Sequence, residues 1–325
     1  NGQINGSGEN HIYMAIRRGP LAEPTSGTDV FATGVVQNNT RKTLTNPLGH
    51  PSDWAFLQTS SGGNWIVQSR LTESADLKFN SSAAEVDNKG YGFANNTNYE
   101  ADGTAAIGAY GWNFRRAPGY FDIATYNGNA QASAITVNHN LSAIPEMMWC
   151  KKRGATGDWM VYHKDLNGGT NPHTYRLRLN SSGGEGTGSG VWNAAPTATQ
   201  FSVGTDLDVN ADANIGFITY LFATLAGISK VGSFTHSNSS GATNVDCGFS
   251  NGARLVIFKR TDSTGDWYVV DSVRGITSGN DPYLELNTTD AEATATELIN
   301  PLNAGFTVQQ YQGVVDGTYI FYAIA

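Results

Sequence analysis

The segment "DLDVNAD" carries an oxygen-bearing side chain at every second position. These residues are Asp206, Asp208, Asn210 and Asp212. Carboxylate and amide oxygens are the ligands that Ca²⁺ prefers, and an EF-hand loop opens with this rhythm. However, Ala211 stands where such a loop needs Gly, and Phe217 stands where its bidentate Glu belongs. A calcium site is therefore one hypothesis, and a polar loop between two strands is the interpretation that the departures favour. No other cofactor is expected.

Three tryptophans end three similar hairpin-like segments. The segments are "WAFLQTSSGGNW", "WCKKRGATGDW" and "IFKRTDSTGDW", and they end at Trp65, Trp159 and Trp267. Exposed indoles make good stacking surfaces for sugars, so ligand binding at these three residues is one hypothesis. A Trp at the first position of a returning strand normally packs across its partner strand and buries a large area. Core packing is therefore favoured over glycan contact.

The sequence predicts no enzyme. It contains no G-x-S-x-G, no H-E-x-x-H, no phosphate-binding Gly loop and no Cys-x-x-Cys. Asp158 and Asp266 recur before two of the tryptophans, but Asn64 takes the same place in the first copy. Asp and Asn both suit a tight turn, whereas only Asp can act as an acid, so a turn role is favoured. Cys150 and Cys247 are expected to be packed thiols.

Two further landmarks follow each hairpin in the same order. The first is a short alternating strand, "DLKFN", "RLRLN" or "YLELN", which places leucines or Phe on one face and Lys78, Arg178 or Glu285 on the other. The second is an apolar strand that is expected to be central and covered on both sides. We align its copies on Tyr13, Tyr110, Tyr220 and Tyr319, which are spaced by about one hundred residues, a common domain size.

The repeats predict an all-β fold of tandem antiparallel β-sandwich modules, jelly-roll-like and about 100 residues each. Residues 1–20 form the terminal strand and linker of an upstream module, so the chain is expected to be a piece of a longer array. Module 1 spans 21–119, module 2 spans 120–227 and module 3 spans 228–325. Each module is expected to bury its own core, and the three later tyrosines are expected to occupy equivalent positions. One undivided interior, with Tyr110, Tyr220 and Tyr319 in non-equivalent surroundings, would remove the basis for an appendage role.

The composition of the chain restricts the classes of partner that it is expected to bind. The chain has 28 acidic and 20 basic residues, a net charge of −8, and its basic pairs are scattered. This balance argues against binding to nucleic acid, which needs clustered positive charge. The apolar run from Ile215 is broken by Gly and Thr and is shorter than the roughly 20 residues that span a bilayer. We expect no membrane insertion.

Modules 2 and 3 resemble a known group of proteins. The segments "ITVNHNLSAIPEMMWCKKRGATGDWMVYHKDL" and "RLVIFKRTDSTGDWYVVDSVR", with the closing apolar strands, resemble the repeated β-module of tail-fibre-like and other virion-surface proteins of phages infecting aquatic bacteria. The resemblance is looser in module 1, where "GGNW" replaces "TGDW". It implies a structural or adhesive role in a tail fibre or head fibre, and it supplies no catalytic residues.

The resemblance and the modular pattern together suggest the partners and the location. We expect a homo-oligomer that contacts other virion proteins, located in the virion after assembly in the host cytoplasm. A host cell-surface glycan is a further candidate partner. Multivalent display would strengthen weak surface contacts. The alternative is a secreted or surface carbohydrate-binding, lectin-like protein of a bacterium. A polysaccharide depolymerase is disfavoured for this segment because the recurrent acidic residues are explained as turn residues.

Overall fold

The chain folds almost entirely into β-structure. The computed structural model describes residues 22–35, 43–44, 52–72, 75–87, 91–92, 99–101, 109–310 and 313–325, so Tyr13 and the expected upstream strand lie outside the described residues. The described helices are the short 3-10 turns η1 (Gly27–Asp29), η2 (Leu166–Gly169), η3 (Pro172–Thr174) and η4 (Asn238–Ser240). Among the described residues no helix has the length and hydropathy to cross a bilayer.

Each module contributes one main antiparallel sheet. Module 1 has the order β1 (Phe31–Val35), β9 (Tyr110–Phe114), β3 (Trp54–Gln58), β4 (Ile66–Ser69). Module 2 has the order β10 (Phe121–Asn127), β18 (Gly216–Phe222), β12 (Met147–Lys152), β13 (Met160–His163), β14 (Tyr175–Arg178), β15 (Gly186–Thr187). Module 3 has the order β19 (Ser229–His236), β26 (Gly317–Ile324), β21 (Leu255–Arg260), β22 (Trp267–Asp271), β23 (Leu284–Glu285). The hairpins and the central apolar strands are therefore confirmed.

Smaller sheets form a second layer. In module 2 this sheet has the order β11 (Ile135–Asn138), β17 (Gln200–Val203), β16 (Trp192–Ala194), and in module 3 it has the order β20 (Thr243–Asp246), β25 (Gly305–Val308), β24 (Ile299–Leu302). Module 1 has β2 (Thr43–Leu44), β8 (Tyr99–Ala101), β7 (Tyr91–Gly92) and a separate pair, β5 (Ala75–Asp76) with β6 (Val86–Asp87). The paired layers confirm an all-β sandwich fold.

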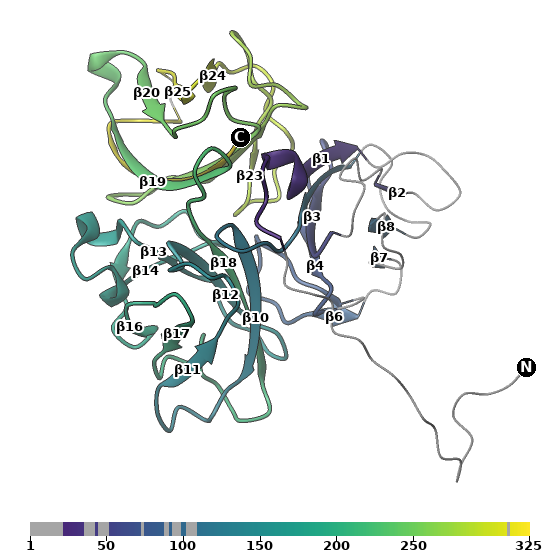
Figure 1. Cartoon of the computed structure of the whole chain (residues 1–325), viewed down its shortest axis with the longest axis vertical. Helices are drawn as coiled ribbons and strands as arrows, with labels where there is room; N and C mark the ends of the chain where they lie inside the picture. Colours follow the sequence, from purple (N-terminus) through teal and green to yellow (C-terminus); the bar gives the residue numbers. More distant parts are fainter. Residues whose placement is uncertain are drawn as a thin grey trace, which may run out of the picture.

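The three main sheets share one interior, which corrects the expectation that each module buries only its own core. In β12, Met147 and Trp149 face a cluster built from all three modules, whereas Met148 and Cys150 face the small sheet of module 2. The same division in module 3 places Ile257 in the shared cluster. The sequence predicted central strands with both faces buried. The small sheet of the same module buries one face, and the other two modules bury the other. Figure 1 shows the three groups of strands arranged around the middle of the molecule.

The tyrosine alignment is also wrong, because the strand registers place the three residues at different levels. Trp112 lies opposite Phe56, Tyr220 opposite Trp149 and Tyr322 opposite Ile257, so these three aromatic residues are the equivalent ones. Tyr110 instead lies opposite Gln58, and Tyr319 lies opposite Arg260. At the equivalent position module 1 has Trp112 rather than Tyr, and β26 contains two tyrosines. An alignment based on residue type alone therefore paired the wrong residues.

Consecutive modules are joined by tight turns of the same kind. Ala117 bridges to Phe121 between modules 1 and 2, and Leu225 bridges to Ser229 between modules 2 and 3. Gly119 and Gly227 adopt φ of 72° and 73°, a left-handed conformation that glycine adopts at little cost. Each turn delivers the last central strand of one module directly into the edge strand of the next. The short linkers therefore fix the order of the modules around the shared interior.

The shared interior predicts that a single module cannot fold alone. Module 3 expressed as residues 228–325 would expose the inner faces of β21 and β26, an apolar patch larger than soluble monomers usually leave uncovered. We expect circular dichroism and ¹H–¹⁵N NMR to show an unfolded or aggregated chain, in contrast to residues 22–325. A monomeric module 3 with a cooperative thermal transition would contradict the shared interior.

Candidate functional site

The three recurrent tryptophans lie inside the shared interior. Trp65, Trp159 and Trp267 are 0%, 0% and 1% exposed. Each indole Nε1 donates a hydrogen bond to a backbone carbonyl of another module: Trp65 to Glu285 at 3.0 Å, Trp159 to Lys78 at 2.8 Å and Trp267 to Arg178 at 3.0 Å. Module 1 therefore bonds to module 3, module 3 to module 2 and module 2 to module 1. Head-to-tail contacts of this kind form a closed ring.

Burial excludes these indoles from contact with a ligand in the folded chain. A sugar must reach an aromatic face to stack on it, and these faces are covered by other aromatic rings. Trp159 lies 5.2 Å from Phe79 of module 1, and Trp267 lies 6.3 Å from Trp149 of module 2, measured between ring centroids. The glycan-contact hypothesis for Trp65, Trp159 and Trp267 is therefore withdrawn, and the packing interpretation stands.

An asparagine that recurs in all three modules holds the turn before the tryptophan. Asn80, Asn180 and Asn287 accept a hydrogen bond at Oδ1 from the backbone N–H of Trp65, Trp159 and Trp267. Their Nδ2 groups donate to Asn64, Asp158 and Asp266 at 2.9, 2.9 and 2.7 Å. The accepting position needs only an oxygen, which Asn and Asp both provide. This geometry supports the turn role over acid catalysis for Asp158 and Asp266.

The residues after that asparagine form a recurring pattern that the sequence analysis missed. The pattern is Asn, two hydroxyl residues, two variable residues and Glu, seen as "NSSAAE", "NSSGGE" and "NTTDAE". The carbonyls of Ser82, Ser182 and Thr289 accept from Gly157, Gly265 and Gly63 at 2.9, 2.9 and 2.8 Å. The N–H groups of Glu85, Glu185 and Glu292 donate to Arg153, Thr261 and Ser60 at 2.9, 2.7 and 3.0 Å. All three junctions thus use the same backbone bonds.

Two buried lysines reinforce two of the junctions. Lys259 Nζ donates to the carbonyls of Ser182, Arg260 and Gly265 at 3.0, 3.0 and 2.6 Å, and Lys151 Nζ donates to Ser82 and Lys152 at 3.3 and 2.8 Å. Burial lowers the pKa of each ammonium to about 8. In module 1 the same position holds Gln58, whose amide donates to Gly63 at 2.8 Å. These lysines are structural cations rather than free nucleophiles.

The expected calcium loop is closed by its own hydrogen bonds. Asn210 is fully buried, and its amide donates to Ser133 and Gly204 while its oxygen accepts from Asn129. Asp206 accepts from the N–H of Asp208, and Asp208 accepts from the N–H of Asp158. Within the described ranges, no group of three or more His, Cys, Asp or Glu side chains is arranged to hold a metal. The structure does not bring Asp206, Asp208, Asn210 and Asp212 together as a ligand set.

The two cysteines are packed thiols, as predicted. Both are free and buried. Burial raises the pKa of Cys150 to about 11 and that of Cys247 to about 12, so neither thiol ionises readily at neutral pH. Cys150 also lies 3.2 Å from the hydroxyl of Tyr126. The thiols contribute packing rather than reactivity.

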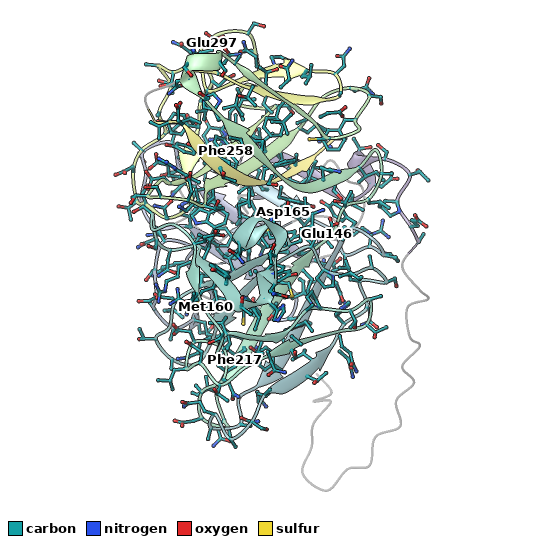
Figure 2. The ribbon with its side chains drawn as sticks, turned by 90° about the vertical axis from the view of Figure 1, so that its left-hand side faces the viewer. Glu146, Met160, Asp165, Phe217, Phe258 and Glu297 are labelled. Atoms are coloured by element: carbon teal, nitrogen blue, oxygen red, sulfur yellow. The ribbon has the colours of Figure 1, made fainter. Side chains whose placement is uncertain are left out.

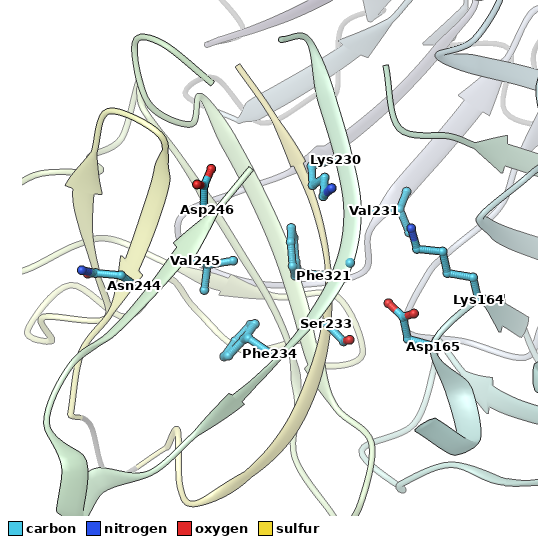
Figure 3. Close-up of a pocket in the computed structure, with 11 residues that line it drawn as sticks. Lys164, Asp165, Lys230, Val231, Ser233, Phe234, Asn244, Val245, Asp246 and Phe321 are labelled. Atoms are coloured by element: carbon cyan, nitrogen blue, oxygen red, sulfur yellow. The ribbon is translucent and has the colours of Figure 1, made fainter. Parts of the chain in front are cut away.

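A groove of about 330 Å³ lies where module 3 meets module 2. It runs along β19, from Lys230 to Phe234, with β20 on one side and the loop after β13 on the other. Figure 2 places Asp165 and Glu146 between the strands of module 3 above and those of module 2 below. In Figure 3, Lys164 and Asp165 lie on one side of β19, and Val245, Asp246 and Phe321 lie on the other. This groove is the candidate functional site.

Charged and polar groups dominate the groove. Lys164 pairs with Glu146 at 2.8 Å, and Asp165 lies 3.9 Å from the ring of buried His163. Burial lowers the pKa of His163 to about 3, so this ring is neutral and gives Asp165 no cationic partner at that position. Across β19, Asp246 accepts from the N–H of Gly248. The groove can therefore offer both hydrogen-bond donors and acceptors to a polar ligand.

The comparisons with known proteins place this chain in one family. A family model described as Domain of unknown function (DUF7483) matches residues 116–325, which is more than half of the chain, so the chain belongs to that family. The matched range contains the main and small sheets of modules 2 and 3. No curated protein matches the chain.

The junction bonds predict a specific stability difference between two tryptophans. Trp267→Phe keeps most of the aromatic packing but removes the donor to Arg178 O, which leaves a buried carbonyl unsatisfied and costs about 1–3 kcal/mol. Trp192 is equally buried, yet its Nε1 has no hydrogen-bond partner among the described residues. Trp192→Phe is thus the matched control for lost volume. Denaturant unfolding that shows equal losses for the two variants would contradict the junction role.

The raised pKa of Glu285 predicts that the folding stability of the chain depends on pH. Arg178, at the same position of module 2, pairs with Asp158 at 2.7 Å, whereas Glu285 lies near Asp266 and Asp290. Burial first, and then these carboxylates, raise the pKa of Glu285 to about 7. Because the folded state holds this proton more tightly than the unfolded chain, stability falls as pH rises from about 4.5 to about 7.

Replacing Glu285 with Arg should remove this weakness. The backbone carbonyl that accepts from Trp65 is kept, and the new guanidinium can pair with Asp266 as Arg178 pairs with Asp158. We expect E285R to have a higher Tm than the parent chain at pH 8 and a smaller decline in Tm between pH 5 and pH 7.5. Scanning calorimetry over this pH range tests it, with exposed Glu23→Gln as control. An unchanged pH profile in E285R would refute the assignment.

Proposed function

We propose that this chain is a non-enzymatic structural and adhesive component of a virion appendage, a tail fibre or head fibre. In that role it forms a compact head that displays loops toward a host surface or neighbouring subunits. The shared interior replaces the elongated array with a closed ring of modules. Modules 2 and 3 also keep cores of their own, so the interior is not undivided and the appendage role can still be proposed. The chain then serves as a knob on an appendage and not as a segment of its shaft.

The closed cycle of three junctions is the observation that carries the proposal. No module can swing away from one neighbour without also breaking its junction with the other, because each module takes part in two junctions. Rigidity is what a display scaffold requires, since a loop held in one position loses less conformational entropy on binding. A protein exposed outside a cell also gains from resistance to local opening.

The segments that follow the repeat asparagine differ in length between modules, whereas the junction bonds recur. From the repeat asparagine to the aligned Phe there are 13, 21 and 19 residues in the three copies, as counted from Asn80 to Phe93, Asn180 to Phe201 and Asn287 to Phe306. Loops carried by a rigid scaffold are the usual location of recognition. The head-to-tail surfaces are already used within one chain, so homo-oligomerisation, which is part of the proposal, would use the outer surface.

Purified particles test the proposal. An antibody against the recombinant chain should label one position on virions by immunogold electron microscopy, and the chain should co-sediment with particles in a density gradient. Recovery from the medium of a virus-free culture, with no particle association, would refute the virion role and favour the secreted carbohydrate-binding alternative. Sedimentation of the full-length protein as a monomer would refute the oligomer.

A further inference from the structure

We propose that the groove along β19 binds an acidic sugar unit, whose carboxylate pairs with Lys230 and whose hydroxyl groups bond to the polar walls. The inference deepens the proposed function, on which it rests, by naming the chemical class of the surface ligand. It concerns module 3 alone, because the corresponding strand positions of module 2 carry different residues.

Lys230 supplies a cation with no carboxylate partner. Among the described residues no Asp or Glu oxygen lies within ion-pair distance of its ammonium, and the side chain is partly exposed at the groove. The register places Asp122 at the same position in module 2. That carboxylate is already satisfied by Arg116 at 2.6 Å and by the N–H of Asn140 at 2.7 Å. Of these two positions, Lys230 therefore offers the charge that can pair with a ligand carboxylate, whereas Asp165 and Asp246 of the same groove can accept only from hydroxyl groups.

The floor of the groove is aromatic and depends on a glycine. Phe321 stands opposite Gly232, and a Cβ on Gly232 would come within 2.8 Å of the Phe321 ring. The corresponding pair in module 2 is Thr219 and Ala124. Phe234, also in the groove, stacks on Tyr319 with ring centroids 5.2 Å apart and remains partly exposed. Phe321 is 3% exposed and packs behind Phe234, so the accessible apolar surface is that of Phe234. Such a surface between polar walls suits a sugar ring, which has apolar C–H faces and a polar rim.

The walls supply the hydrogen-bonding groups that hydroxyls need. Asp165 and Asp246 present carboxylate oxygens that accept from hydroxyl groups, and exposed Ser233 and Asn244 can donate or accept. Figure 3 shows Ser233 on the side of β19 that faces Asp165. The volume of about 330 Å³ is at the lower end of small-molecule sites, which suits one sugar unit of a longer chain.

The edge of β19 argues against an added peptide strand as the occupant. Val231 N–H donates to Thr224 Oγ1 at 3.1 Å, so the backbone groups of Val231 point away from β26 and are already used. By alternation, the next outward-facing residues are Ser233 and Thr235. An added strand would form only a short ladder with these two residues, whereas their N–H and C=O groups can serve single hydroxyl contacts. A small polar ligand fits this edge better than strand addition does.

Titration with charged and uncharged oligosaccharides tests the proposal. The probes are tetrasaccharides of galacturonate, mannuronate and a glucuronate-containing polymer, each with its methyl ester as the neutral control. We expect at least one acid to shift the ¹H–¹⁵N NMR signals of Lys230, Gly232 and Ser233, and its ester to bind at least tenfold more weakly. Affinity should also fall as salt rises. Lack of response to all three acids, or equal binding of acid and ester, would overturn the proposal.

Two variants localise the effect. Lys230→Gln should weaken binding of the responding acid about tenfold or more, because it removes a charge-assisted bond without deleting the side chain. Lys78→Gln is the control, since Lys78 lies at a junction and contributes its backbone carbonyl, which the substitution keeps. Unchanged binding in Lys230→Gln, or signal shifts outside the groove, would refute the site, as would binding of an acidic peptide in preference to every sugar.

The two proposals can fail separately. If the chain labels virions but no acidic sugar binds, the groove assignment is wrong and the appendage role stands. If an acidic sugar binds at Lys230 but the chain is recovered only from virus-free medium, the groove assignment stands and the appendage role is wrong.

Discussion

The structure depends on one repeated interaction, the hydrogen bond from a buried indole to a backbone carbonyl of the adjacent module. A buried carbonyl without a donor is costly, and a large buried aromatic side chain contributes much of the packing energy of a core. Each tryptophan meets both needs at a junction. Since the three bonds run in one direction around the molecule, they close a ring and leave no junction surface open. The other junction contacts, which are the backbone hydrogen bonds and the bonds from the buried lysines, surround these three bonds.

This arrangement explains why the module sequences are similar in some places and different in others. Positions at a junction must satisfy two modules at once, so the tryptophan, the asparagine and the glutamate that follows it recur in every copy. Positions on the perimeter meet no such requirement. Lys230 and Asp122 stand at the same register and carry opposite charge. Junction positions that act through their backbone also vary, as Lys78, Arg178 and Glu285 do. Divergence therefore marks a candidate recognition surface only where the side chain is accessible, as at Lys230.

Much of the local structure could be predicted from the sequence, because it follows from alternation along each strand. Leu77, Leu177 and Leu284 are each 1% exposed, as their strand pattern indicates. The shared interior could not be predicted in the same way, since a strand covered on both faces looks the same whether its second cover is a sheet or another module. The tyrosine alignment failed for a related reason: Tyr319 and Tyr322 both lie on β26, and only the register distinguishes them. For the groove, the sequence offered no signal, because β19, β20 and the loop after β13 meet only in the folded chain.

The range matched by the family model shows which junction contacts module 1 must supply. Residues 116–325 contain both sides of only one junction, the one at which Trp267 donates to Arg178. Trp159 and the carbonyl of Glu285 find their partners at Lys78 and Trp65, outside that range. A two-module unit would therefore leave one donor, one acceptor and two apolar sheet faces uncovered. Module 1 satisfies all of these at once, so in this chain it completes the fold of the family domain and is not a separate neighbour joined to it.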